Sequence, residues 1–467
     1  MENPLVFGTD GWRGEIAHDF TFQNVRRVSL ALARVLKPRS TVAVGFDFRF
    51  LSEEFAREAA GVLAAHGHRV WVVKEATTSP ALSFSLKRLS AAAGVMITAS
   101  HNPPSYNGFK IKVPPGRSAD PTFTAQVEGM IEAEIPPSNL GAKVDSFSPN
   151  EGYVKALLSR LELKWWREKK TPLAVDAMHG SGGPVWEEIF RHLKLKGEIV
   201  RGQRDPLFGG IPPEPIEPHL APLVEAVRRT KAVIGVGVDG DADRLGVIDD
   251  TGAYLPPHTV FPLLFRHLVQ NRRLKGPLVQ ATSMGYLSER MAKTWGVPVT
   301  HVPVGYKHVA DEMARCKTLL GGEESGGYGV GVWGLERDGI LSGLLLMELV
   351  LAEGKPLSVL RQEMYKEFGV SDYQRVDLPL RTPIPDRAAW EKAVAQRVPE
   401  KLTGKVVRQK KSGDGLKIIL EDGSWLLLRP SGTEPLLRTY AETPDPVTTA
   451  QLLRKAQEWA GTKIGTP

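Results

Sequence analysis

The chain has 467 residues, which at roughly 150 residues per domain corresponds to about three compact units. Hydrophobic residues make up 42% and charged residues 24%, so a disordered or collagen-like chain is excluded despite 46 Gly and 35 Pro. Lys and Arg exceed Asp and Glu by 60 to 53, a net charge of +7 spread along the chain. We therefore expect small phosphorylated molecules as partners and no nucleic acid.

Cysteine usage and the apolar segments indicate a cytoplasmic protein. The single Cys316 can form neither an intramolecular disulfide nor a cysteine-based zinc site, which fits a reducing compartment. No basic region followed by an apolar stretch opens the chain, and the richest apolar segment, Ile340–Ala352, is too short to span a bilayer and contains Glu348. We expect no export and no membrane partner. The basic cluster Lys405–Lys411 is expected to be a solvated loop.

Apolar runs followed by helical patterns recur along the chain and predict α/β layers. The strand Ser40–Asp47 precedes the helix Ser52–Ala60, and the strand Thr171–Asp176 precedes the helix Pro184–His192. A third buried parallel strand is predicted at Gly276–Thr282. Further strands are predicted at Val70–Val73, Gly94–Ile97, Ala232–Val236 and Leu245–Ile248. These suffice for three sheet-containing units related by a diverged internal repeat.

From about Gly369 the pattern changes and predicts a small α+β domain. Lys417–Arg429 reads as a hairpin that turns at Asp422 and Gly423. Clusters of Pro, Gly and Asp between the patterned stretches predict four domains, at residues 1–148, 149–252, 253–368 and 369–467.

Three carboxylates, Asp239, Asp241 and Asp243, follow a predicted strand and are followed at once by Arg244. Packed so closely, they repel one another unless a cation compensates, and oxygen ligands select Mg²⁺ before Ca²⁺. An EF-hand loop is excluded because it would need Gly in place of Arg244 and Glu in place of Asp250. The alternative is a polar turn between strands.

Two segments, Gly235–Gly240 and Gly329–Gly334, formally match the dinucleotide-binding glycine fingerprint. The first runs into carboxylates that would repel a pyrophosphate, and the second lacks a preceding apolar strand. A redox dehydrogenase is therefore a distant alternative.

Ser100 follows a predicted strand, beside His101, in a turn that ends in Pro103 and Pro104. Because the prolines favour a rigid exposed turn, we expect the serine to be presented to solvent. A nucleophilic serine needs a base or a metal, and the chain has no Gly-x-Ser-x-Gly elbow. The alternative is an ordinary turn serine.

A glycine-rich segment, Gly321–Gly327, contains Glu323, Glu324 and Ser325. Backbone can approach a ligand there, and carboxylates accept hydrogen bonds from hydroxyls, which suits a sugar. A flexible acidic loop is the equally weighted alternative.

The segment Arg429–Pro435 combines a guanidinium, hydroxyls and backbone N–H groups, the ingredients of a phosphate clamp. Ser431 and Glu434 have the spacing of a helix capping box, which is the alternative. We favour the anion site because Leu437–Glu442 alternates like a strand.

Together with an N-terminal glycine-spaced turn, these segments resemble the α-D-phosphohexomutase superfamily, the phosphoglucomutase/phosphomannomutase enzymes, over essentially the whole chain. The five signatures are Gly8–Gly14, Thr98–Pro103, Asp239–Arg244, Gly322–Gly326 and Arg429–Pro435. The resemblance implies an α/β fold of three related α/β domains with mixed sheets plus a smaller C-terminal α+β domain, arranged around a central cleft.

The resemblance also implies a phosphoryl group on Ser100, which becomes the fourth ligand of Mg²⁺ beside the three aspartates. Arg13, Arg244 and Lys110 would stabilise charge near the transferring group. Lys110 is the first candidate for general acid/base catalysis, and His101 is the second.

The implied reaction transfers the phosphoserine phosphate to a hexose monophosphate, with glucose 1,6-bisphosphate as primer and intermediate. Glu323 and Ser325 would hold the 3- and 4-hydroxyls of the sugar, and Lys307 would be a further sugar-phosphate contact. The phosphate that is not reacting would be held by Arg429, Ser431, Gly432 and Thr433.

Gly327 stands where many phosphomannomutases and phosphoglucosamine mutases have His, and Arg204–Gly210 resembles the glucose-type members. We therefore expect glucose phosphate first and mannose phosphate second. The alternatives are a phosphoglucosamine mutase and a non-catalytic paralogue that binds sugar phosphates. We expect a monomer or weak dimer.

Overall fold

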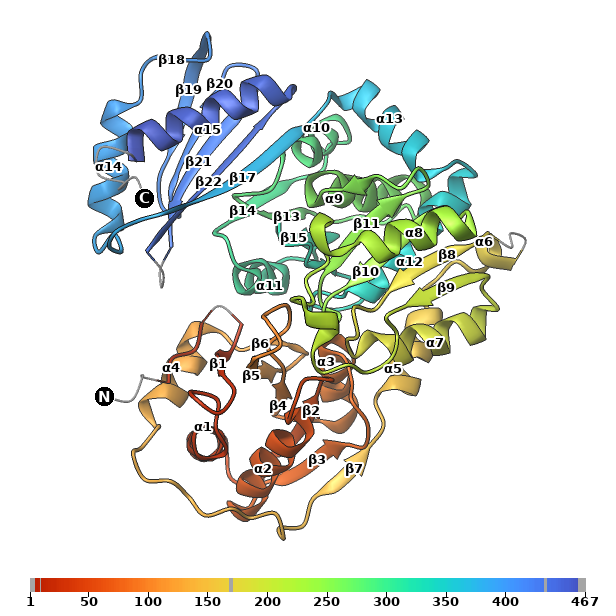
Figure 1. Cartoon of the computed structure of the whole chain (residues 1–467), viewed down its shortest axis with the longest axis vertical. Coiled ribbons are helices and arrows are strands. Elements are labelled where there is room, and N and C mark those ends of the chain that lie inside the picture. Colours follow the sequence, from red (N-terminus) through yellow and green to blue (C-terminus); the bar gives the residue numbers. More distant parts are fainter. Residues whose placement is uncertain (1–4, 9, 168–170, 432–434, 461–467) are drawn as a thin grey trace.

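The computed structural model describes residues 5–8, 10–167, 171–431 and 435–460. Their strands form four separate sheets, and we call the units built around these sheets domains I to IV, in chain order. Figure 1 shows the four units following one another along an arc, with domain I at one end and domain IV at the other. Within the described ranges, no helix is long and apolar enough to cross a membrane.

Domain I contains a mixed seven-stranded sheet with helices packed against it. Its strands are β1 (Trp12–Glu15), β2 (Thr41–Phe46), β3 (Arg69–Val73), β4 (Ala93–Ile97), β5 (Tyr106–Val113), β6 (Arg117–Ser118) and β7 (Asp145–Phe147). Its helices are α1 (Phe22–Val35), α2 (Ser52–Ala65), α3 (Ser79–Leu89) and α4 (Pro121–Gly129). The side chains of Thr21 and Thr78 cap the N-termini of α1 and α3.

Domain II contains a mixed five-stranded sheet. Its strands are β8 (Leu173–Asp176), β9 (Gly197–Val200), β10 (Ile234–Val238), β11 (Leu245–Asp249) and β12 (Tyr254–Leu255). Its helices are α5 (Asn150–Leu158), α6 (Leu163–Arg167), α7 (Gly182–Leu193) and α8 (Ala221–Thr230), with short helices η1 (Phe208–Gly210) and η2 (Glu217–His219).

Domain III contains a mixed four-stranded sheet. Its strands are β13 (Leu278–Ala281), β14 (Val299–Val302), β15 (Leu320–Gly322) and β16 (Tyr328–Val330). Its helices are α9 (Pro257–Arg266), η3 (His267–Asn271), α10 (Tyr286–Thr294), α11 (Tyr306–Arg315), α12 (Gly339–Glu353) and α13 (Leu357–Phe368). The apolar segment Ile340–Ala352 is thus most of α12, a helix buried almost entirely within the protein.

Domain IV contains a six-stranded sheet in which every pairing is antiparallel. Its strands are β17 (Asp372–Pro379), β18 (Lys401–Leu402), β19 (Lys405–Lys411), β20 (Leu416–Leu420), β21 (Trp425–Pro430) and β22 (Leu436–Thr443), and its helices are α14 (Arg387–Arg397) and α15 (Pro446–Ala460). The hairpin predicted at Asp422 and Gly423 is confirmed, since β20 and β21 pair across that turn. The fold class is confirmed as three mixed α/β domains and one α+β domain.

The first three sheets share one strand order, which confirms the predicted repeat. Their central strands follow the orders β5-β4-β2-β3, β11-β10-β8-β9 and β16-β15-β13-β14. In each, the first three strands along the chain are parallel and the fourth runs antiparallel to the third. The turn between the third and fourth strands contains Ser100 in domain I, Asp239–Arg244 in domain II and Glu323–Ser325 in domain III. Three of the predicted site segments therefore occupy equivalent positions.

The four sheets define four domains, but the largest apolar core is shared between two of them. The largest core runs without a break from domain II, around Trp186, into domain III, around Phe261 and Leu344. Domains I and IV each have a large core of their own. Domains II and III consequently share buried apolar surface, which favours a fixed arrangement of the two.

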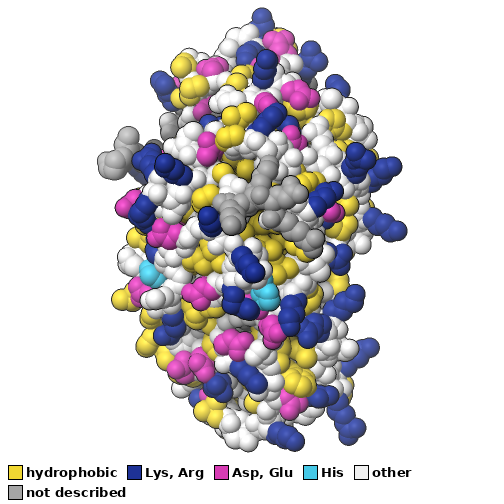
Figure 2. All heavy atoms as spheres, turned by 90° about the vertical axis from the view of Figure 1, so that its right-hand side faces the viewer, with side chains coloured by type: hydrophobic (Ala, Val, Ile, Leu, Met, Phe, Trp, Pro, Cys, Tyr) yellow, Lys and Arg dark blue, Asp and Glu magenta, His cyan; other side chains and the backbone are white. Residues whose placement is uncertain are grey.

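The basic cluster Lys405–Lys411 is a strand, not the predicted loop. It is β19, which pairs with β18 and β20, and most of its side chains are exposed. The polar composition concealed the strand because little of it is buried, so few apolar residues are required there. On the face of the molecule in Figure 2, basic and acidic side chains are interspersed.

Two short strands lie near the predicted domain boundaries. β7 pairs with β3 and so belongs to the sheet of domain I, while β12 pairs with β11 in domain II although it follows Gly252. The boundaries themselves stay predictions from the sequence.

Candidate active site

Ser100 lies in the turn between β4 and β5, with a backbone φ of +55°. The buried guanidinium of Arg49 donates to the carbonyl oxygens of Ser100 at 2.7 Å and Asn102 at 2.6 Å, and also to those of Pro103 and Tyr106. This clamp fixes the shape of the turn. The predicted exposure of Ser100 is wrong, however: its side chain is buried, because the loop after β10 covers it.

The aspartate loop after β10 meets the serine turn at the junction of domains I and II. Ser100 Oγ donates a hydrogen bond to Asp239 Oδ2 at 2.6 Å. A Cβ atom on Gly240 would lie only 2.6 Å from the carbonyl oxygen of Ser100, so glycine is required for this approach. The Ser79 hydroxyl donates to the carboxylate of Asp241 across the same junction. The structure thus brings the serine and the acidic loop, 139 residues apart in sequence, into direct contact.

The three carboxylates converge on a single point. Asp239, Asp241 and Asp243 are all buried, and each offers an oxygen atom within 4.8 Å of the others. The Oδ1 atoms of Asp241 and Asp243 are buried without a hydrogen-bond partner. Buried acceptors of this kind are costly unless something satisfies them. The donor set, all carboxylate oxygens, therefore fits a hard divalent cation.

The carboxylates do not share their negative charge equally. Burial raises the pKa of Asp239 well above its usual range, and the neighbouring charges of Asp243 and Asp241 raise it further. Burial also opposes ionisation of Asp241, but the ammonium of Lys110 outweighs it and lowers the pKa of that carboxyl. Asp241 is consequently the more firmly ionised of the two.

Lys110, on β5, lies among carboxylates from two domains. Its Nζ atom is 2.7 Å from Asp241, 3.1 Å from Asp243 and 2.8 Å from Asp10 of the N-terminal turn. Burial alone would lower the pKa of Lys110, but these carboxylates outweigh burial and raise it. Lys110 is therefore held as an ammonium ion in this arrangement.

His101 and Arg13 flank the serine from the side of domain I. His101 Nδ1 lies 3.4 Å from Ser100 Oγ, so the neighbouring residue does reach the hydroxyl. Burial lowers the pKa of His101, and the nearby charges of Arg244 and Arg13 lower it further, which keeps the imidazole neutral. Arg13, on β1, donates to Asn102 Oδ1 at 2.5 Å and so lies beside the same turn.

Arg244 ends the aspartate loop and contributes through both its backbone and its side chain. Its backbone N–H donates to Asp239 Oδ1 at 3.0 Å. Its guanidinium lies 3.5 Å from Glu214, and its charge is among those that act on His101. We call the cluster formed by Ser100, its neighbour His101 and the three aspartates the Ser100 centre. The predicted cations Arg13, Lys110 and Arg244 all lie at this centre.

Arg337, just before α12, was not predicted from the sequence and connects three domains at the centre. It is buried and donates to one carboxylate from each of three domains: to Asp10, to Asp243 at 2.8 Å and to Glu323 at 3.1 Å. Burial alone would lower the pKa of Arg337, but Asp243 and Asp10 outweigh it and raise the pKa. The available signal was a run of three charged residues, 336–338, directly before a strongly apolar segment.

The predicted sugar-binding turn lies against this centre. Ser325 Oγ donates to Glu323 Oε1 at 2.6 Å, and the same oxygen also accepts from Arg337. The backbone N–H of Leu245 donates to the carbonyl oxygen of Gly326 at 2.9 Å, which joins this turn to the aspartate loop. Equivalent turns from domains I, II and III therefore meet at one place.

The predicted phosphate-binding residues lie at the junction of domains III and IV. Lys307 is in the first turn of α11, Arg429 is near the end of β21, and Ser431 follows it as a buried residue. The alternative of a helix capping box at Ser431 is excluded, because β22 begins at Leu436. The predictions at Gly432 and Thr433 fall outside the described residues.

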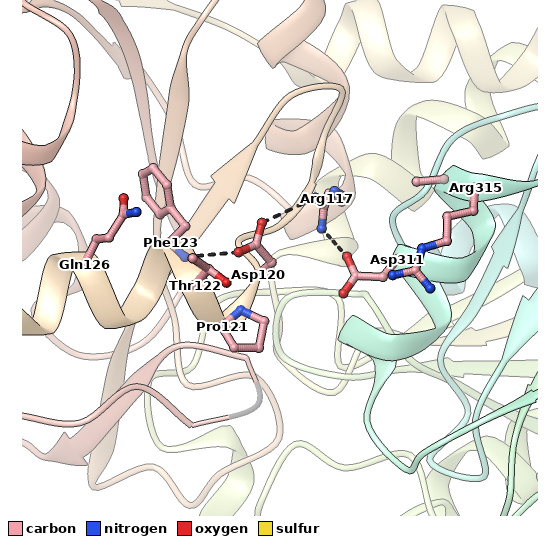
Figure 3. A pocket seen from close by; sticks show the side chains of 9 residues that line it. Arg117, Asp120, Pro121, Thr122, Phe123, Gln126, Asp311 and Arg315 are labelled. Carbon is pink, nitrogen blue, oxygen red and sulfur yellow. Dashed lines mark hydrogen bonds and ion pairs between the residues drawn. The ribbon is translucent and has the colours of Figure 1, made fainter.

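A groove of 650 Å³ between domains I and III contains none of the predicted site residues. Figure 3 shows Arg117, on β6, pointing to Asp311 on α11, with which it forms an ion pair at 2.5 Å. Asp120 lies 3.6 Å from the same guanidinium. The positive charge of Arg117 is therefore balanced by these two carboxylates. The ion pair with Asp311 is a polar contact between domains I and III in addition to those at the Ser100 centre.

Four family models match the chain in order. Their descriptions are phosphoglucomutase/phosphomannomutase, alpha/beta/alpha domain I, at residues 4–137, domain II at 151–252 and domain III at 256–368, and the C-terminal domain of the same family at 394–457.

Similar proteins carry more than one name. A probable phosphoglucosamine mutase of Methanothermobacter thermautotrophicus is 32% identical, over 94% of this chain and 94% of its own. A phosphoglucomutase/phosphomannomutase of Thermococcus kodakarensis is 31% identical over the same shares of both chains. Among solved structures, a putative phosphomannomutase from Thermus thermophilus matches with a TM-score of 0.87 and 33% identity, covering 99% of this chain and 100% of its own.

Proposed function

Since the chain belongs to the phosphoglucomutase/phosphomannomutase family and is therefore a phospho-sugar mutase, we propose that it interconverts hexose 1-phosphates and hexose 6-phosphates through a phosphoryl group on Ser100. In the first half-reaction the bond between phosphorus and Ser100 Oγ breaks and a bond to a sugar hydroxyl oxygen forms; in the second, a bond between phosphorus and a sugar oxygen breaks and the bond to Ser100 Oγ forms again. In the first the sugar hydroxyl loses its proton and Oγ gains one, and in the second these proton transfers run in reverse. The 1,6-bisphosphate then returns its other phosphoryl group to the serine, and glucose 1,6-bisphosphate is the proposed primer.

The observation that carries this proposal is the 2.6 Å contact between Ser100 and Asp239. A serine with a positive φ, clamped by Arg49 and covered by an acidic loop, is an arrangement that an ordinary turn serine does not need. It places the hydroxyl next to a cation-binding set of carboxylates, where a phosphoryl group can be both held and activated.

The opposite pKa shifts of two neighbours suggest their roles. His101 is neutral and 3.4 Å from Ser100 Oγ, so its ring nitrogen is placed to accept a proton, while its lowered pKa makes it a weak base. Lys110 is held as an ammonium, which suits it to donate a proton or to stabilise charge on the transferring group. The sequence ranked Lys110 before His101 for general acid/base catalysis, and we propose that the two divide this work between them.

Asp239, Asp241 and Asp243 would hold Mg²⁺, with the phosphoryl oxygen on Ser100 as a further ligand. When bound, the ion polarises the phosphoryl group and neutralises charge that develops during transfer. The unpartnered oxygens of Asp241 and Asp243 support this assignment, because they have no other use among the described residues.

The remaining assignments follow from the positions of the loops. Glu323 and Ser325 would bind the 3- and 4-hydroxyls of the sugar, with Lys307 as a further contact. The phosphate that is not reacting would bind to Arg429 and Ser431, together with Gly432 and Thr433. Contact with only the 3- and 4-hydroxyls tolerates either configuration at C2, so glucose phosphate is proposed first and mannose phosphate second.

Phosphoglucosamine is the second candidate, because several similar proteins are named for it. The surroundings of Gly327 weigh against it. A Cβ atom there would lie 2.6 Å from Cδ of Arg337, so the arginine fills the space that a larger residue would take. Arg337 also neutralises Glu323, which leaves less negative charge to attract a 2-ammonium group.

Intact-mass analysis tests the phosphoserine. After incubation with glucose 1,6-bisphosphate and Mg²⁺, the wild-type protein should gain one phosphate and Ser100→Ala should gain none. Ser105→Ala, which changes an exposed serine of the same turn, is the matched control and should behave as wild type. A phosphate retained by Ser100→Ala contradicts the assignment.

Turnover of glucose, mannose and glucosamine 1-phosphates by the same preparation orders the substrates, with glucose expected to be fastest. Failure to convert any of them with Mg²⁺ and primer would instead support the non-catalytic alternative. Cytoplasmic localisation and a monomer or weak dimer stay predictions from the sequence.

A further inference from the structure

Asp414 connects two of the proposed phosphate-binding elements. It lies between β19 and β20 in domain IV. Its Oδ1 atom accepts a hydrogen bond from Arg429 Nε at 2.8 Å, and its Oδ2 atom accepts one from the backbone N–H of Val304 in domain III at 2.5 Å. Val304 lies two residues before α11, whose first turn contains Lys307. A single carboxylate therefore links the arginine of one domain to the lysine loop of another.

The loop around Asp414 is built to hold this carboxylate in place. Glu391, buried on α14, accepts hydrogen bonds from the backbone N–H groups of Gly413 and Gly415, each at 2.9 Å. Both glycines have positive φ, +133° and +88°. A Cβ atom on Gly415 would lie 2.9 Å from Cα of Arg429, so the loop is pressed against the strand that bears the arginine. Helix, loop and strand together fix where Asp414 points.

The contact also determines how Arg429 can bind a ligand. A guanidinium held through Nε has a fixed plane, and its two Nη groups then form a fork that matches a phosphate. The charged groups of the junction also act on a neighbouring histidine, His308. Partial burial lowers the pKa of His308, and the charges of Lys307, Asp414 and Arg429 all act on it.

We infer that Asp414 is a positioning residue, which orients Arg429 toward the phosphate that is not reacting and docks domain IV on the loop at residues 303–305 of domain III. The inference rests on the proposed function, because it takes Arg429 as a phosphate ligand. On this inference the contact with Val304 anchors the carboxylate that orients Arg429, and Asp414 does not itself touch the phosphate, so its effect on phosphate affinity must disappear when Arg429 is absent.

A double-mutant cycle tests this dependence. The affinity for glucose 1,6-bisphosphate is measured by calorimetry for the wild type, Asp414→Ala, Arg429→Ala and the double variant. Asp414→Ala should weaken binding about tenfold, and Arg429→Ala at least as much. The double variant should bind no more than about twofold more weakly than Arg429→Ala alone. Glu458→Gln, an exposed carboxylate of α15 paired with Lys455, is the control and should match the wild type.

Losses that multiply in the double variant, or wild-type affinity in Asp414→Ala, overturn the inference. Asp414→Asn, which keeps one carbonyl oxygen as an acceptor, should lie between the wild type and Asp414→Ala. It also takes the place of the alanine variant in the cycle if the latter does not fold, as judged by thermal melting.

Turnover separates this inference from the proposed function. In Asp414→Ala we expect KM for glucose 1-phosphate to rise while kcat changes less, because the phosphate concerned is bound equally before and during transfer. If the wild-type protein has no mutase activity but the binding cycle shows the coupling, the proposed function fails and the role of Asp414 stands. If turnover is present but the losses multiply, the role of Asp414 fails alone.

Discussion

The Ser100 centre and the Arg429 junction both bring opposite charges together, but they differ in burial and in the domains they join. At the centre, Asp239, Asp241 and Asp243 are completely buried and are faced by Lys110 and Arg337. At the junction, the side chains of Arg429 and Asp414 are 14% and 15% exposed. The centre is assembled from domains I, II and III, whereas the junction lies between domains III and IV.

This difference corresponds to two tasks. In a buried cluster water cannot compensate for a missing partner, so each charge has a large effect and the geometry is set before substrate arrives. At the junction, the exposed fraction lets water and a ligand reach the charged groups, so removing one partner costs less than at the centre. The centre therefore suits bond-breaking chemistry, and the junction suits reversible recognition of either end of a substrate.

Among the changes proposed here, removing the divalent cation should have the largest effect on the mutase rate. A small effect would contradict the assignment of the chemistry to the buried centre. Excess EDTA should lower the mutase rate by about a thousandfold, since a bound metal ion supplies several kcal/mol of charge stabilisation in the transition state. Added Mg²⁺ should restore the rate. EDTA already saturated with Mg²⁺ is the control and should leave the rate unchanged. Full activity in metal-free EDTA would mean that the acidic loop is not a catalytic metal site.

Replacing Arg337 tests the buried centre from the side of domain III. Arg337→Ala leaves Asp10, Asp243 and Glu323 without a shared partner, and should lower the stability by about 3–5 kcal/mol, measured by chemical denaturation. Arg337→Lys keeps the charge but not the fork, and should lose less. Arg315→Ala, which changes an exposed arginine on α11, is the matched control and should cost less than about 1 kcal/mol. If Arg337→Ala and Arg315→Ala lost equal stability, the expectation that a buried charge contributes more than an exposed one would be contradicted.

Replacing Lys417, at the interface of domains III and IV, should have the smallest effect on stability. It tests a buried charge at this interface for comparison with those of the Ser100 centre. Its Nζ atom donates to the carbonyl oxygen of Thr282, and burial lowers the pKa of Lys417 to about 8. The unfolded chain, with an ordinary lysine pKa, binds more protons between that pH and about 10.4, so the folded state gains stability as pH rises through this window.

Lys417→Met removes this dependence. The free energy of unfolding of the wild type relative to Lys417→Met, measured by chemical denaturation, should therefore rise between pH 8 and pH 10, by on the order of 1–3 kcal/mol. Lys401→Met, at an exposed position of β18, should show no such trend. A constant difference between wild type and Lys417→Met across the window would contradict the assignment.

The sequence predicted the parallel strands well because burial on both faces leaves an uninterrupted apolar run, as in β2 and β10. It failed at β19, where exposure removes the apolar signal. Among site residues, those in glycine-rich or charge-dense turns could be found, because a short segment carries the whole pattern. Arg49 and Arg337 could not, since their importance lies in contacts with distant loops. The burial of Ser100 likewise depends on a second domain and leaves no local trace.

The three equivalent turns have a consequence for how the chemistry could vary. Each turn closes the same strand pair, β4 with β5, β10 with β11 and β15 with β16, so its residues can change without altering the pairing on either side. One structural position, used three times, supplies a hydroxyl, a set of acids and the carboxylate that we propose to bind the sugar. The proposed catalytic machinery is thus a composite of three loops, each of which closes the same strand pair on a constant framework.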